Sequence, residues 1–135
     1  MPDDVIVAKA AIVERCRGRA RQELAASVDL ANDHTRQHAA ILNIERACDG
    51  AIDISDRVVR LRGLGAPASA RDSLAKLIAD GLIEQGLADR LMRMVGSRNL
   101  AVHQDQKLDL AIVRAVIEKN LDDVLEFSAL ALRLP

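Results

Sequence analysis

The chain has 135 residues, enough for one domain that buries a single core without a metal or disulfide staple. Its 19 Lys and Arg residues against 20 Asp and Glu give a formal net charge of −1. This balance excludes a strongly basic protein that holds nucleic acid by bulk electrostatics, so any RNA contact must be local. Half of the residues are apolar but only one is aromatic, and a core of Leu, Ile, Val and Ala favours packed helices.

Two features of the sequence bear on the compartment. Cys16 and Cys48 have neither CxxC nor zinc-site spacing, and two isolated thiols are typical of a reducing compartment. The first residues form no basic leader, and Lys9 interrupts the first apolar run, which predicts neither a signal peptide nor a membrane span. We therefore expect a cytoplasmic protein with no membrane contact.

Apolar residues in the first half of the chain recur at steps of three and four, the period of amphipathic helices. A first helix is predicted over about residues 5–31, where Gly18 marks a close helix contact or a slight bend. Asn32 and Asp33 predict a break and an N-cap before a second helix that ends near residue 62. Two long helices joined in this way should pack antiparallel. The residues expected to face inward are Val5, Ile12, Val13, Cys16, Ala20, Leu24 and Val28 in the first helix and Ile41, Ile44, Cys48, Ile52, Ser55 and Val59 in the second.

The second half predicts three further helices. Residues 63–68 contain two glycines and a proline, which indicate a loop. Ser69 is expected to cap a short third helix, with Asp72 as the acidic partner in its first turn, and Asp80 and Gly81 to end it. Residues 1–135 are thus expected to form a single all-α domain of about five helices. The fourth helix starts near residue 83 with Leu87, Leu91, Met94 and Val95 inside, and the fifth covers about 108–132 with Leu110, Val113, Val116, Ile117, Leu121, Val124 and Phe127 inside.

Four arginines alternate along the first predicted helix. On a helix this spacing separates them into two stripes, Arg15 with Arg19 and Arg17 with Arg21, so they do not form one continuous basic face. The pattern favours a solvated surface, and an RNA-guiding edge is the alternative.

Two histidines, His34 and His38, have the i, i+4 spacing that can hold a metal ion on one face of a helix. They fall in the first helical turn, where exposed polar residues are common, and no third ligand accompanies them, so we predict no metal site. The loop at residues 63–68 lacks the Gly-Lys-Ser or Gly-Lys-Thr ending of a Walker loop. The sequence therefore indicates no cofactor.

The stretch Arg98–His103 is the candidate catalytic motif. Arg98 is a strong phosphate binder, and His103 has an ordinary pKa of about 6.5, suited to proton transfer near neutral pH. An Arg and a His can cleave an RNA phosphodiester without metal, because the imidazole moves the proton of the 2′-hydroxyl and the guanidinium stabilises charge on the phosphoryl oxygens. Asn99 would orient the imidazole or donate to the phosphate.

Helical geometry limits this motif. Residues five apart on a helix are rotated by about 500°, a net 140°, so one regular helix does not present Arg98 and His103 on the same face. A joint site requires a distorted helix end or a second subunit. The alternative is structural: His103 interacts with the dipole at a helix C-terminus, and Arg98 pairs with a carboxylate such as Asp105 or Asp109.

The segments Gln37–Ala47, Met94–His103 and Ile117–Val124, together with the loop Gly63–Pro67, resemble the HepT toxins of the HEPN superfamily. The likeness covers nearly the whole chain. It implies an all-α HEPN helical bundle that forms a homodimer and acts as a metal-independent endoribonuclease on RNA. It also implies a partner, a minimal nucleotidyltransferase that serves as the antitoxin of a type II toxin-antitoxin system.

The same resemblance assigns catalysis to an Arg-x4-His motif at the dimer interface, and Arg98, Asn99 and His103 are the matching positions. A dimer also resolves the rotation problem. Two copies of the motif that face each other across a two-fold axis would place two imidazoles and two guanidiniums around one phosphate.

The sequence departs from the family pattern beyond the motif. Many relatives continue as His-x-Tyr, and the partner nucleotidyltransferase modifies that tyrosine with adenylyl groups, but here the position is Asp105 and the chain contains no Tyr. A cognate antitoxin would therefore act by occlusion or through another residue. The alternative is a non-catalytic subunit that binds the nucleotidyltransferase or its substrate. His38, where many relatives carry Asp, is a lesser departure.

Overall fold

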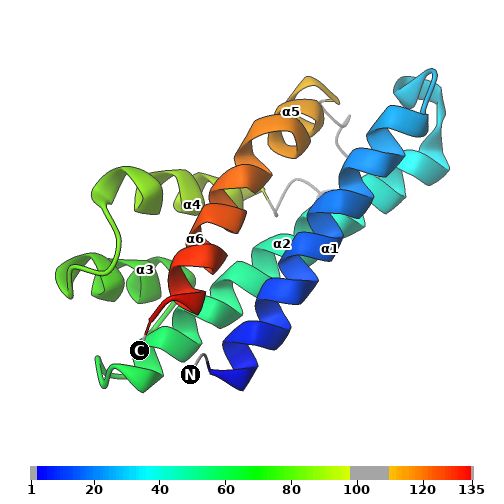
Figure 1. The fold of residues 1–135 in the computed structure, drawn as a ribbon. Coiled ribbons are helices and arrows are strands. Elements are labelled where there is room, and N and C mark those ends of the chain that lie inside the picture. Colours follow the sequence, from blue (N-terminus) through cyan, green and yellow to red (C-terminus); the bar gives the residue numbers. More distant parts are fainter. Residues whose placement is uncertain (1–2, 98–109, 135) are drawn as a thin grey trace.

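The structure is a computed structural model that describes residues 3–97 and 110–134, and every regular element in these ranges is helical (Figure 1). The described part therefore confirms the all-α prediction. Five helices are present if the last three elements are counted as one, because α5, η3 and α6 follow one another without a break. The elements are α1 (Asp4–Ala26), the 3-10 turn η1 (Leu30–Asn32), α2 (His34–Leu61), α3 (Ala70–Ala79), α4 (Gln85–Ser97), α5 (Leu110–Ala115), the π-helical turn η3 (Val116–Asn120) and α6 (Leu121–Leu132).

Helices α1 and α2 form a long antiparallel hairpin, as predicted (Figure 1). They approach closely at Gly50, where a Cβ atom would lie 2.8 Å from Cγ2 of the fully buried Val13. One turn away, Lys9 Nζ and Asp53 Oδ2 form an ion pair of 3.0 Å. A residue without a side chain thus lets the two backbones approach and sets the register of the hairpin.

The remaining helices cover one side of this hairpin. Helix α6 contacts α1, α2 and α4, so it lies between α1 and α4, while α3 packs on α2 and α4 (Figure 1). Ser55 of α2 and Ser73 of α3 are both buried and share a hydrogen bond of 2.6 Å, which satisfies two polar groups inside the core. Phe127 is the single aromatic residue of a core that is otherwise mostly aliphatic. Its largest fully buried side chains are Phe127, Ile6, Ile54, Leu77, Met94, Ile117, Leu121, Val13, Val58, Val59, Val124 and Cys48.

Three helix starts are fixed by side-chain caps. The carboxylate of Asp33 accepts from the Arg36 amide at the start of α2, and Ser69 Oγ accepts from the Asp72 amide at the start of α3, as predicted. The Asp72 carboxylate also accepts from the amide of Ala68, the residue before the cap, and so ties the preceding loop to the first turn of α3. The third cap, which was not predicted, is Asp3 at the start of α1.

The first helix is shorter than predicted. It ends at Ala26, and Val28, expected inside, is fully exposed at 103%. The reason lies in the buried side chain of Gln37, whose Nε2 donates to the carbonyl oxygens of Leu30 and Ala31 at 2.5 and 3.1 Å. These two carbonyl groups receive their hydrogen bonds from a side chain of α2. The chain can therefore turn through η1 instead of continuing α1.

Gly18 is not a close helix contact, because a Cβ atom there would meet nothing within 4 Å. The constrained glycine is Gly50.

Within the described residues, no helix is both long and apolar enough to span a bilayer.

We expect opposite effects when alanine replaces these two glycines. Gly18→Ala should raise the free energy of unfolding by about 0.5–1 kcal/mol, because alanine lowers the entropic cost of the helix and meets no neighbour. Gly50→Ala should be less favourable than Gly18→Ala by about 1–3 kcal/mol, because the stiff, buried Val13 must shift. Urea unfolding of both variants measures the difference, and equal stability would contradict the close approach.

The start of α1 should depend on pH. The hydrogen bonds from the Arg57 guanidinium, followed by those from the backbone amides of Ile6 and Val5, lower the pKa of Asp3 from its ordinary value. A lowered pKa in the folded state means that the stabilisation is present above the ordinary aspartate pKa of about 3.9 and disappears as the pH falls through the folded value. Asp3→Asn keeps a good N-cap but removes the charge, so it should lower Tm at pH 7.

Thermal unfolding followed from pH 7 to pH 2 tests this ion pair. The difference in Tm between wild type and Asp3→Asn should begin to shrink below about pH 3.9, where the carboxyl group of the unfolded chain takes up a proton, and should disappear below the lower pKa of the folded protein. Asp3→Ala, which removes the cap as well, should remain less stable at all pH values. A constant difference between wild type and Asp3→Asn would show that the charge of Asp3 does not act through Arg57.

Candidate active site

The residues predicted to be catalytic, Arg98, Asn99 and His103, lie outside the described residues, as do their proposed structural partners Asp105 and Asp109. The structure describes the helices on either side of the motif. The described part of helix α4 runs to Ser97, the residue before Arg98 in the sequence, and the described chain resumes in α5 at Leu110. Both ends of the candidate catalytic segment are thus attached to described helices.

Helix α4 is held by a buried apolar face. Leu87, Leu91 and Met94 are buried as predicted, and Cys48 Sγ of α2 donates to the Met94 carbonyl oxygen at 3.5 Å. This contact lies one helical turn before the motif, so it fixes the last part of α4 against the middle of α2. Cys48 was predicted to face inward, but its hydrogen bond to α4 was not predicted, because a thiol donor has no spacing signature in the sequence.

A second tie joins α4 to α6. The guanidinium of Arg90 donates from Nε to Asp123 Oδ1 at 2.9 Å, and its Nη2 lies 3.6 Å from Glu126 Oε2. The Asp123 side chain is only 17% exposed, so this pair is better shielded from solvent than most surface pairs. Helix α4 is thus attached to both α2 and α6.

The other end of the motif is held by α5 and η3. Val113, Val116 and Ile117 are buried, which confirms the predicted inner face. The π-helical turn was not predicted. Such turns are frequent at functional sites, and this one begins six residues after the first described residue of α5.

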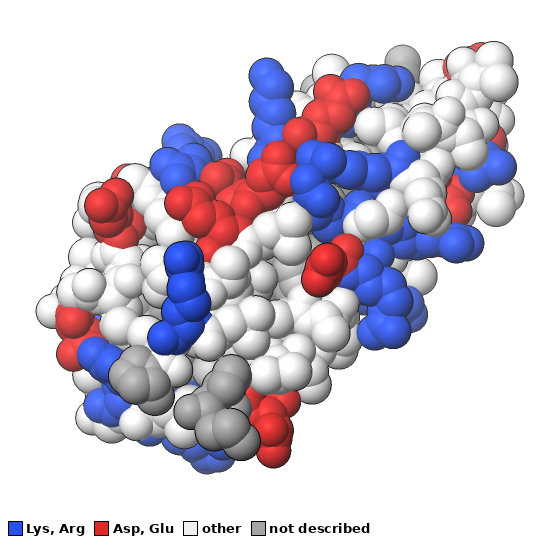
Figure 2. All heavy atoms as spheres, viewed as in Figure 1, with Lys and Arg blue, Asp and Glu red and all other residues white. Residues whose placement is uncertain are grey.

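Helix α1 is attached to η3 and α6 through two arginines. Arg17 Nη2 lies 2.6 Å from Asp122 Oδ1, and Arg21 Nη2 contacts the same oxygen at 3.2 Å. Arg21 Nη2 also donates to the carbonyl oxygen of Glu118 at 3.3 Å. The stripe of Arg17 and Arg21 is therefore an intramolecular clamp, not the freely solvated surface that the sequence favoured. Acidic and basic side chains accordingly lie next to one another on this face (Figure 2).

Other chemically active side chains in the described part offer no competing site. His34 and His38 are both exposed, and no group of three or more His, Cys, Asp or Glu residues in the described ranges is placed to hold a metal ion. Burial raises the pKa of the Cys16 thiol, so this sulfur remains protonated near neutral pH and is a poor nucleophile.

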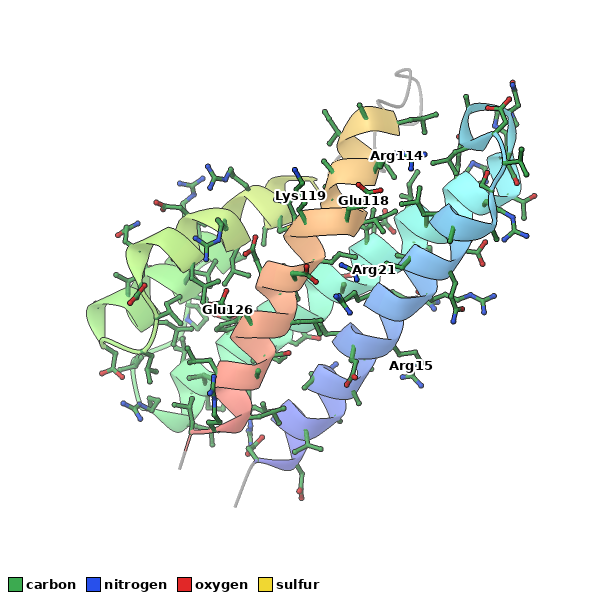
Figure 3. The ribbon with its side chains drawn as sticks, turned by 45° about the horizontal axis from the view of Figure 1, so that its top comes forward. Arg15, Arg21, Arg114, Glu118, Lys119 and Glu126 are labelled. Carbon is green, nitrogen blue, oxygen red and sulfur yellow. The ribbon has the colours of Figure 1, made fainter. Side chains whose placement is uncertain are left out.

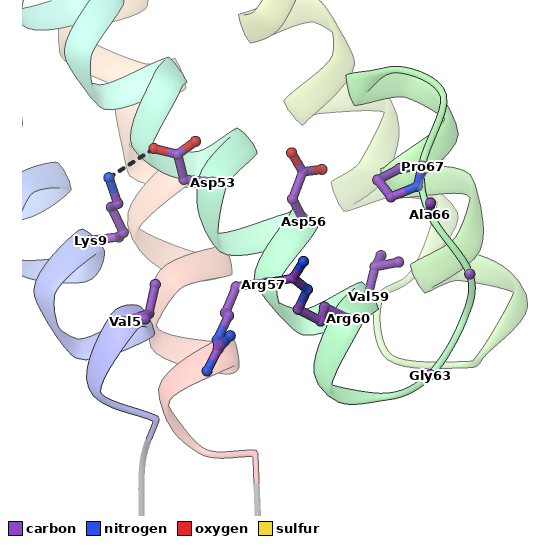
Figure 4. Close-up of a pocket in the computed structure, with 11 residues that line it drawn as sticks. Val5, Lys9, Asp53, Asp56, Arg57, Val59, Arg60, Gly63, Ala66 and Pro67 are labelled. Carbon is purple, nitrogen blue, oxygen red and sulfur yellow. Dashed lines mark ion pairs between the residues drawn. The ribbon is translucent and has the colours of Figure 1, made fainter.

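A pocket of about 900 Å³ lies between the start of α1, the end of α2 and the loop that follows α2 (Figure 4). Positive φ angles at Gly63 and Gly65 shape this loop. Lys9 and Asp53, which line the pocket, form an ion pair with each other. No His, Cys or Ser lines the pocket. The start of α1 and the end of α2, which line this pocket, lie at the opposite end of the bundle from α5 (Figure 1).

Comparison with known proteins agrees with this architecture. The family "Ribonuclease HepT-like" matches residues 11–130. The mRNA nuclease HepT of Shewanella oneidensis is 41% identical over 125 residues, which cover 93% of this chain and 94% of that protein.

Solved structures show the same fold. A tri-AMPylated Shewanella oneidensis HEPN toxin in complex with MNT antitoxin is 40% identical, with a TM-score of 0.87 over 95% of this chain and 96% of that one. A toxin-antitoxin structure with AMP-PNP is also 40% identical, with a TM-score of 0.89 over 96% and 98% of the two chains. The resemblance noted in the sequence is thereby confirmed, and this chain belongs to the HepT-like ribonuclease family.

Proposed function

We propose that this protein is the toxin of a toxin-antitoxin pair in the cytoplasm, a metal-independent endoribonuclease that cleaves RNA through Arg98, Asn99 and His103 of a homodimer. The observation that carries the proposal is the intact Arg-x4-His motif in a chain that is 41% identical to an mRNA nuclease over 93% of its length. The motif lies between two helices, α4 and α5, that are both anchored in the core.

The chemistry follows from the residue types. A neutral His103 accepts the proton of an RNA 2′-hydroxyl, and the oxygen attacks the adjacent phosphorus. Arg98 stabilises the negative charge that develops on the phosphoryl oxygens. The 5′-oxygen leaves with a proton from the imidazolium of the partner subunit, which yields a 2′,3′-cyclic phosphate and a 5′-hydroxyl. Asn99 orients the imidazole or the phosphate.

Regulation is expected to differ from that of the AMPylated relative. The Shewanella toxin was solved in a tri-AMPylated form in complex with MNT antitoxin, whereas this chain contains no tyrosine. An antitoxin of the minimal nucleotidyltransferase class would therefore neutralise this toxin by covering its site. The partner would thus be of the same class as that of the Shewanella toxin, but it would inhibit without AMPylating a tyrosine.

We expect purified wild-type protein to cleave RNA in the presence of EDTA, because neither imidazole nor guanidinium requires a metal. Arg98→Ala and His103→Ala should each reduce the rate by about 10²-fold or more, the usual contribution of a positioned acid-base or electrostatic group. Gel assays with end-group analysis measure the rate and should detect 2′,3′-cyclic phosphate ends.

His34→Ala and Arg71→Ala serve as matched controls, because both residues are exposed and lie on α2 and α3, outside the motif. They should cleave at the wild-type rate. Equal cleavage by all five proteins would refute the assignment of the motif.

Sedimentation of the active samples should show dimers, and a monomer that cleaves at full rate would contradict a site made from two chains.

Expression without antitoxin should arrest growth, and His103→Ala should relieve the arrest. Co-expression with a minimal nucleotidyltransferase should restore growth through a stable complex, and intact-mass spectrometry should find no added AMP on this chain. Activity should then return when the two proteins are separated. Harmless expression of the wild type together with tight complex formation would instead support a non-catalytic binding subunit.

A further inference from the structure

A shallow groove separates the last turns of α1 from α5 and η3. Its volume is about 430 Å³, and Arg21, Leu24 and Ala25 line it from α1, while Arg114 and Glu118 line it from the other side. Figure 3 shows Arg21, Arg114 and Glu118 on the facing sides of these helices. We refer to it as the Arg21–Arg114 groove.

The groove has a local excess of positive charge. Arg17 and Arg21 share the single carboxylate of Asp122, so one of the two positive charges is not neutralised by this contact. Arg21 is also held in place, since its Nη2 donates to the Glu118 carbonyl oxygen at 3.3 Å. A guanidinium that is fixed and incompletely neutralised is ready to bind an anion without a further loss of side-chain entropy.

Arg114 completes the groove on the other side. Its Nη1 lies 3.6 Å from Glu118 Oε1, and the two side chains are 54% and 49% exposed. An ion pair this long and this exposed to solvent holds the guanidinium weakly. Arg114 can therefore exchange Glu118 for an incoming anion, and the apolar atoms of Leu24 and Ala25 leave a surface for a sugar or base between the two arginines.

The position of the groove connects it to the motif. Arg114 lies four residues after Leu110, one helical turn from the point where the described chain resumes after the catalytic segment. The whole chain has a net charge of −1, so phosphate binding must come from such local excesses of positive charge.

We propose that the Arg21–Arg114 groove binds the RNA backbone next to the phosphate that is cleaved, with each arginine contacting a phosphate. The inference rests on the proposed nuclease function and assigns these residues to substrate binding rather than to catalysis. Glu118 acts as a competitor that keeps Arg114 paired while RNA is absent.

Binding of a short 2′-O-methyl oligonucleotide tests the groove directly, because this probe lacks the attacking hydroxyl and is not cleaved. Arg114→Gln should weaken binding by about two- to fivefold, the range of an exposed ion pair. It should also reduce the slope of log K against log salt by about 0.7, the value for one phosphate contact on a single strand. Glu118→Gln should strengthen binding, because it removes the competing carboxylate.

Arg15→Gln is the matched control. Arg15 is an exposed arginine of α1 without an ion-pair or hydrogen-bond partner among the described residues, and it points away from the groove (Figure 3). It should leave both the affinity and the salt slope unchanged. Arg114 is more informative than Arg21, because a change at Arg21 would also release α1 from α6.

The outcomes separate this proposal from the proposed function. If wild type cleaves RNA but Arg114→Gln and Arg15→Gln bind the probe equally well, the groove assignment is overturned and the nuclease stands. If wild type does not cleave but Arg114→Gln lowers affinity and slope and Glu118→Gln raises affinity, the groove stands and the nuclease assignment falls. Absence of probe binding by wild type overturns the groove. With cleavable RNA, Arg114→Gln should raise KM and leave kcat unchanged.

Discussion

The close approach of α1 and α2 at Gly50 is the constraint on which the other helix positions depend. Only a residue without a side chain lets the backbone of α2 lie against Val13. This contact fixes the hairpin register, and the register in turn places Arg17 and Arg21 opposite α6 and Cys48 opposite the last part of α4. Both ends of the catalytic segment are therefore held by partners on the same hairpin.

The π-helical turn η3 belongs to this arrangement. In a π-helical turn one residue is added to the helix, and the i→i+4 pattern of carbonyl contacts is interrupted. Here the carbonyl of Glu118 accepts a hydrogen bond from Arg21, so a side chain of α1 compensates for the irregular backbone. The hydrogen bond from Arg21 thus joins the irregular turn to α1, and Arg21 and Glu118 both line the Arg21–Arg114 groove.

The sequence predicted those features that depend on local chemistry. Helix periodicity, the caps at Asp33 and Ser69 and the antiparallel hairpin follow from neighbouring residues, and the structure confirms them. Features that depend on distant partners were not predictable. The end of α1 is set by Gln37 from the next helix, and the choice between Gly18 and Gly50 as the close contact depends on which residue faces Val13. The predicted catalytic residues lie outside the described ranges and stay predictions.

The many arginines illustrate why composition alone could not locate a binding surface. Most of the described arginines form ion pairs within the chain. Their charge is neutralised where each arginine has a carboxylate of its own. Glu23, for example, contacts two arginines, but one of them, Arg36, also has Asp33 as a second partner. The cluster at Asp122 differs because two arginines of α1 share this one carboxylate. In a chain with a net charge of −1, two arginines that share one carboxylate beside the Arg21–Arg114 groove give a polyanion a local reason to bind there.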